Sequence, residues 1–103
     1  MQINAQKQFS ALLRAAATQQ IAEDDFWNQF NSLVDPENDD IAGLALESAT
    51  HYWGNFHQRN LLFIPAKPDA GQLQQGRDEL NLIADAIDGN WPLPELERRL
   101  KDV

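Results

Sequence analysis

Hydrophobic residues recur at helical spacing along most of the chain. In the first twenty residues they fall on one face of an expected helix, at Ala5, Phe9, Leu12, Leu13 and Ala16. The stretch "IAEDDFWNQFNSLV" (residues 21–34) predicts a second helix with a buried stripe of Phe26, Trp27, Phe30, Leu33 and Val34. The polar stretch at residues 18–20 is expected to connect the two helices.

The sequence also indicates where the second and third helices begin and end. With Ala22 as N-cap, Ile21 and Phe26 occupy the positions of a hydrophobic staple. Pro36 pushes Asp35 out of helical geometry and separates the second helix from a third. The third helix carries its stripe at Ile41, Leu44, Ala45, Ser48, Ala49 and Tyr52, and Gly54 is its expected terminator.

Two further helices are predicted in the C-terminal third of the chain. One carries Leu73, Leu80, Ile83, Ala84 and Ile87 and is expected to close at Gly89. A last short helix carries Leu93, Leu96 and Leu100. Residues 55–71 stay unassigned, with residues 60–64 expected outside the helices. We therefore predict a single all-α domain over residues 1–103, a bundle of about five short helices whose core includes the phenylalanines and Trp27, Trp53 and Trp91.

Composition narrows the class of protein. The chain has 16 acidic and 8 basic residues, a formal net charge of −8 and no cysteine, which excludes disulfides and thiolate zinc sites. That charge would repel nucleic acids and anionic membrane surfaces, so direct binding to either is not expected. No apolar run has the length of a signal peptide or a membrane span, and we expect a soluble cytoplasmic protein.

The acidic residues are unevenly distributed. Between Arg14 and Arg59 the chain has no lysine or arginine, yet this stretch contains Glu23, Asp24, Asp25, Asp35, Glu37, Asp39, Asp40 and Glu47. These eight acids equal the whole net charge, because the rest of the chain has eight acids and eight bases. The asymmetry indicates a surface suited to a positively charged partner.

Metal binding and catalysis are less well supported. A calcium loop beginning at Asp35 would need glycine at its sixth position and glutamate at its twelfth, where this chain has Asp40 and Leu46. Glu47, His51 and His57 offer ligands for zinc or iron, but no HExxH-like spacing is present. A contact between Glu47 and His51, four residues apart on a helix surface, is the simpler interpretation. No nucleophile elbow or phosphate loop is found, so neither an enzyme nor a cofactor is predicted.

Helix capping explains only part of the acidic stretch. Residues 23–25 and 35–40 occupy expected helix starts, where carboxylates accept backbone amides and suit the helix dipole. Capping does not explain why both helices lack basic residues on their outer faces, where opposite charges usually alternate. A basic partner would relieve the resulting repulsion. We therefore predict a partner-binding face formed by the eight acids together with His51 and Tyr52, with Trp27 and Trp53 as further candidate anchors.

With its acidic stretch "AEDDFWNQFNSLVDPENDD", the chain resembles bacterial immunity proteins, which protect cells from nuclease colicins and contact-dependent growth inhibition toxins. The resemblance covers the whole chain in size, charge and helicity but carries no diagnostic motif. It implies a tight one-to-one complex with a basic nuclease toxin, whose substrate face is blocked. Two alternatives remain open: an acidic nucleic-acid mimic or helical adaptor that binds a basic regulator, and a small metal-dependent enzyme.

Overall fold

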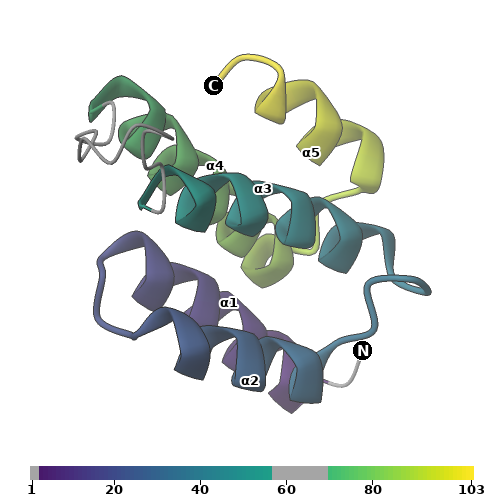
Figure 1. Ribbon diagram of the computed structural model, residues 1–103. Coiled ribbons are helices and arrows are strands. Elements are labelled where there is room, and N and C mark those ends of the chain that lie inside the picture. The colour runs from purple at the N-terminus through teal and green to yellow at the C-terminus, as the bar shows by residue number, and fades with distance from the viewer. Residues whose placement is uncertain (1–2, 57–69) are drawn as a thin grey trace.

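Five α-helices form the part of the chain that the computed structural model describes, residues 3–56 and 70–103 (Figure 1). They are α1 (Ile3–Ala17), α2 (Glu23–Leu33), α3 (Asp40–Phe56), α4 (Ala70–Gly89) and α5 (Leu93–Leu100). No strand occurs within these two ranges. The prediction of an all-α bundle of about five helices is confirmed.

Helix α4 is the central element of the bundle. It packs against α1, α3 and α5, whereas α2 packs mainly against α1, with which it forms an antiparallel pair (Figure 1). Most predicted stripe residues are fully or nearly buried, and the large side chains without exposed surface are Phe9, Leu13, Phe26, Phe30, Tyr52, Leu80, Ile83 and Leu96. The period of the hydrophobic pattern therefore predicts the inward faces correctly.

Aromatic side chains fill the space between α2 and α3. The rings of Phe26 on α2 and Trp53 on α3 lie 5.9 Å apart, and Phe30 meets Phe9 of α1 edge to face at 5.5 Å. Trp53 is buried, as predicted, but Trp27 and Trp91 are only partly buried at the margin of the core. Large rings bury much apolar area each, so a few of them suffice to hold α2 in place.

Two glycines were predicted to end helices, and the structure confirms Gly89 but not Gly54. Gly54 does not terminate α3, which continues to Phe56. Gly89 is the last residue of α4, but the left-handed residue that ends the helix is Asn90 (φ 52°), and Trp91 N–H donates to Ala86 O at 3.0 Å. This pattern closes a helix when the residue after it adopts positive φ, which asparagine tolerates better than most residues. Gly89 serves a different purpose, because a Cβ there would lie 2.7 Å from Trp91 Nε1.

The turn after α1 is also closed by a residue with positive φ, but this residue is a glutamine, which tolerates that conformation less well than asparagine. Gln19 has φ 58°, and Gln20 N–H donates to Ala15 O at 2.8 Å. A side chain with a Cβ is strained in this left-handed region, where glycine is the usual choice. The short predicted connector at residues 18–20 is therefore present but strained.

Helices α3 and α4 approach each other closely at a glycine. A Cβ placed on Gly76 would lie 2.9 Å from Tyr52 Cδ1 and 3.3 Å from Tyr52 Cβ. Tyr52 is fully buried at this crossing, and its hydroxyl donates to Ala16 O of α1 at 2.9 Å. One tyrosine thus joins three helices, which requires a residue without a side chain on α4.

The unassigned segment at residues 55–71 has helical ends, because α3 extends to Phe56 and α4 begins at Ala70. The prediction that residues 60–64 lie outside helices concerns positions beyond the described ranges. None of the described helices is both long enough and apolar enough to cross a membrane.

Candidate protein-binding face

The first acidic group lies at the start of α2. Ala22 is the N-cap, as predicted, and makes no side-chain cap hydrogen bond, so Glu23, Asp24 and Asp25 supply the negative charge of the first turn. Glu23 Oε2 accepts a hydrogen bond from Trp27 Nε1 at 3.1 Å. Asp24 and Asp25 are exposed, and neither carboxylate forms a hydrogen bond or ion pair with another described residue.

The second acidic group lies in the loop between α2 and α3, and half of it supports the backbone. Asp35 Oδ1 accepts Glu37 N–H at 3.1 Å, which fixes the turn after Pro36. Asp39 Oδ1 accepts the amides of Ile41 and Ala42 at 3.0 and 3.1 Å and is the N-cap of α3. These two aspartates therefore have structural roles.

The remaining acids of the stretch have no such role. Glu37, Asp40 and Glu47 are exposed, and their carboxylates form no hydrogen bond or ion pair with the described residues. Together with Asp24 and Asp25 they leave five exposed carboxylates without a partner in the described ranges. Hydrogen bonds thus account for Glu23, Asp35 and Asp39. Asp24, Asp25 and Asp40 suit a helix dipole without such a bond, and Glu37 and Glu47 have neither role.

The arginines that form ion pairs do so elsewhere. Arg14 donates to Asp85 at 2.7 Å and to Asp88 at 2.9 Å, joining α1 to α4. Hydrogen bonds to Asp85 and then Asp88 raise the pKa of Arg14, while hydrogen bonds from Ser10 and then Arg14 lower the pKa of Asp88.

On α5, the guanidinium groups of Arg98 and Arg99 both bind Glu95, and the hydrogen bond from Arg98 is the main cause of its lowered pKa. These ion pairs thus lie on α1, α4 and α5, away from the acidic stretch.

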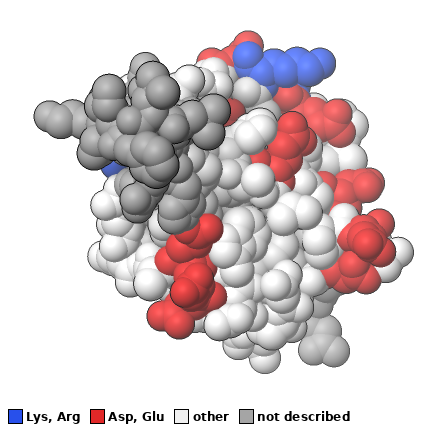
Figure 2. Space-filling view, in the orientation of Figure 1, with Lys and Arg blue, Asp and Glu red and all other residues white. Residues whose placement is uncertain are grey.

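The five exposed acids do not form one continuous patch. Helix α2 has 11 residues and spans about 16 Å, with residues 23–25 at one end and residues 35–40 beyond the other. Viewed toward α2 and α3, the acidic side chains form separate groups with uncharged surface between them (Figure 2). A partner would therefore meet negative charge at the two edges of this face and mainly uncharged residues between them.

Two predicted members of the face differ in their exposure. His51 is exposed on α3, but no hydrogen bond or ion pair joins it to Glu47, so the predicted contact between them is not formed. Tyr52 is fully buried and held by Ala16, which contradicts its prediction as a partner-binding residue. Its position in the apolar stripe of α3 predicted burial correctly, because residues three or four apart along a helix lie on the same face.

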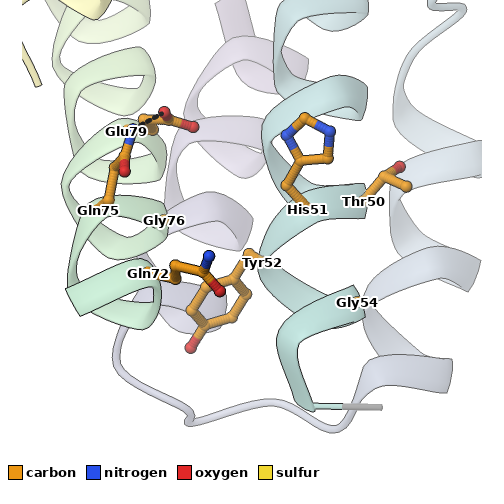
Figure 3. Close-up of a pocket in the computed structure, with 8 residues that line it drawn as sticks. All are labelled: Thr50, His51, Tyr52, Gly54, Gln72, Gln75, Gly76 and Glu79. Carbon is orange, nitrogen blue, oxygen red and sulfur yellow. Dashed lines mark hydrogen bonds between the residues drawn. The ribbon is translucent and has the colours of Figure 1, made fainter. Parts of the chain in front are cut away.

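A groove of about 420 Å³ lies between α3 and α4 (Figure 3). Its floor is the close contact of Tyr52 with Gly76, and its walls include Thr50 and His51 on α3 and Gln75 and Glu79 on α4. Sequence reasoning missed the α4 residues because it did not predict which helices would pair. A glycine in the middle of an otherwise regular helix was the available signal of a close approach.

Ligands for a metal do not gather in the described ranges, which contain no group of three or more His, Asp or Glu side chains able to hold an ion. His57, the third ligand of the metal-site alternative, lies outside the described residues. The arrangement that remains is a carboxylate-rich surface beside a polar groove, which is suited to binding positively charged groups.

Comparison with known proteins identifies no relative, because no protein-family model, curated protein or solved structure matches this chain.

Proposed function

We propose that this protein binds and neutralises a basic protein toxin, in the manner of an immunity protein. The observation that carries the proposal is the set of five exposed carboxylates on α2, α3 and their connecting loop: Asp24, Asp25, Glu37, Asp40 and Glu47. The remaining described arginine, Arg77, lies on α4 and not on these elements. A partner with a basic face would supply the missing counter-charges in a one-to-one complex.

Electrostatic complementarity gives such a complex rapid association. Exposed charges of one sign steer an oppositely charged partner and raise the association rate constant far above the value for neutral surfaces. An inhibitor that must bind a toxin before it reaches its substrate benefits directly from this rate. A nuclease is the favoured target, because its substrate face must be basic to bind a polyanion.

The grouping of the acids favours a folded toxin over the alternative of nucleic-acid mimicry. Duplex DNA carries one negative charge per roughly 1.7 Å of its axis, so a mimic needs a closely spaced row of carboxylates. Four of the five exposed acids lie instead beyond or at the two ends of α2, and Glu47 lies on α3, with uncharged surface between the groups (Figure 2). A protein face with basic residues around an uncharged centre matches this pattern better.

The test begins with the protein encoded immediately upstream, whose C-terminal domain should be toxic in a bacterial host and harmless when this chain is co-expressed. Association of the two purified proteins should slow steeply as salt rises, because exposed charges are screened over about 8 Å at physiological ionic strength. An association rate that stays flat from low to high salt would show that the acids do not steer the partner.

A matched pair of triple variants tests the residues themselves. Asp24→Asn, Asp25→Asn and Asp40→Asn remove three partnerless charges and leave the Asp35 and Asp39 hydrogen bonds intact. We expect affinity to fall about tenfold or more, since desolvated charge-assisted contacts contribute roughly 1.5–3 kcal/mol each. The control removes three charges from α4 and beyond, with the substitutions Asp78→Asn, Glu97→Gln and Asp102→Asn. Equal losses in both variants would indicate net charge alone rather than a defined face.

A further inference from the structure

The groove between α3 and α4, which we call the cation socket, is lined by hydrogen-bond acceptors and one carboxylate, which suit a positively charged ligand. Glu79 is partly buried on the α4 wall, opposite His51 on the α3 wall (Figure 3). Gln75 Nε2 donates to Glu79 Oε1 at 3.4 Å, a long bond that leaves the second carboxylate oxygen and the amide oxygen of Gln75 able to accept from other donors. No lysine or arginine is among the described residues that line the groove.

The floor of the groove explains why the space exists. Tyr52 and Gly76 are in contact, so the two helix backbones approach closely while the longer side chains on either side of the contact diverge toward solvent. Because the Tyr52 hydroxyl is already bound to Ala16 O, the floor offers no polar atom of its own. The groups that select a ligand are therefore the acceptors on the walls, namely a carboxylate, an amide oxygen and an imidazole nitrogen.

We propose that this groove binds the guanidinium group of an arginine side chain. A guanidinium has five N–H donors in a planar fork and no acceptor, which suits a site with several acceptors and one carboxylate. The inference rests on the proposed function for the source of that arginine, which is the basic partner. It goes further by adding α4 to the interface, next to the α3 residues of the acidic face.

The isolated full-length protein tests the groove without any partner. In a titration followed by two-dimensional NMR, the probe Nα-acetyl-arginine N-methylamide should give saturable shifts at the backbone amides of Thr50, His51 and Gly76. We expect an affinity in the millimolar range for this free probe. Shifts that do not saturate, or that are spread evenly over the surface, would overturn the assignment.

Two variants of α4 provide a matched comparison. Glu79→Gln removes the carboxylate in the groove and should weaken probe binding about tenfold, the effect of one charge-assisted contact. Asp78→Asn is the control and removes the same charge one residue earlier. Exposed Asp78 accepts a similar hydrogen bond from Gln74 at 2.9 Å, and its loss should change probe binding by less than about threefold. Equal effects of the two variants would refute the socket. So would equal affinity for the corresponding lysine amide, because the proposal requires a planar multi-donor group.

The outcomes separate this inference from the proposed function. If Glu79→Gln weakens probe binding about tenfold but no basic toxin partner is found, the groove assignment stands and the proposed function fails. A toxin that binds wild type and Glu79→Gln equally well leaves the function in place and removes the socket.

Discussion

Replacing Asp39 with alanine should destabilise the fold, whereas the same change at Asp40 should have little effect. Asp39 Oδ1 accepts two backbone amides at the start of α3, and one of them belongs to Ala42, which is fully buried. Asp40 is exposed in the first turn and makes no such bond. Comparing substitutions at these two neighbouring positions therefore distinguishes the effect of helix capping from the effect of negative charge.

The expected magnitude follows from these contacts. Loss of an N-cap aspartate costs about 0.5–2 kcal/mol, and the upper half of that range applies because two amides lose their acceptor and one of them is buried. For a domain of this size each kcal/mol lowers the Tm by roughly 4–8 °C. The Asp39→Ala variant should therefore melt roughly 5–15 °C below wild type. Asp40→Ala loses about 0.3–1 kcal/mol of dipole interaction and regains part of it through the helix propensity of alanine.

Thermal melts followed by far-ultraviolet circular dichroism measure both effects. Asp39→Asn serves as the internal control, because asparagine caps about as well as aspartate and should retain most of the stability. If the Tm of Asp39→Ala equals that of Asp40→Ala, the two hydrogen bonds from Asp39 do not stabilise the start of α3. The division of the acids into helix caps and binding residues would then be wrong.

The remaining predictions concern strain, packing and pH. Gln19→Gly should raise the Tm by about 4–8 °C, since it relieves roughly 1 kcal/mol of left-handed strain; an unchanged or lower Tm would contradict this. Gly76→Ala should lower the Tm because its Cβ would meet Tyr52, although alanine usually stabilises a helix, and a higher Tm would refute the close approach. Tyr52→Phe should cost about 0.5–1.5 kcal/mol in urea unfolding, because Ala16 O loses the Tyr52 hydroxyl and keeps Gln19 N–H as a donor, and no loss would contradict that bond. Asp88 has a lowered pKa in the fold, so its stabilising contribution is present above the ordinary value of 3.8 and disappears as the pH falls through the folded pKa. Ser10→Ala removes the main cause of that shift, and unfolding free energies at neutral and acidic pH should then differ less than in wild type; an equal difference would contradict the assignment.

Local patterns predicted the helices well because they depend on local physics. A 3.6-residue period places Phe9, Phe26 and Leu80 inward whatever their partners are, and Pro36 interrupts a helix in any context. The displaced end of α3 has an equally physical cause. Glycine permits termination without enforcing it, so α3 passes through Gly54, where an added Cβ would meet none of the described residues within 4 Å.

The site was harder to predict because it depends on which helices become neighbours. The acids of α2 and its following loop are visible in the sequence, but their division into the caps Asp35 and Asp39 and five exposed carboxylates depends on hydrogen bonds formed after folding. Gln75 and Glu79 lie more than twenty residues from His51, and only the pairing of α3 with α4 brings them to one groove. Its use as an aromatic anchor beside the acids placed Tyr52 outside, whereas the apolar stripe of α3 correctly placed it inside.

The central position of α4 has a consequence for how the chain folds. The hydrogen bonds from Arg14 of α1 to Asp85 and Asp88 of α4 join residues more than seventy positions apart. Such long-range contacts require closure of a large loop before they contribute, and they slow folding relative to neighbouring helix pairs. During synthesis, the α1–α2 pair and α3 leave the ribosome with apolar faces exposed until residues 70–89 follow. Nascent chains that stall before α4 should therefore be the species most prone to aggregate or to require a chaperone.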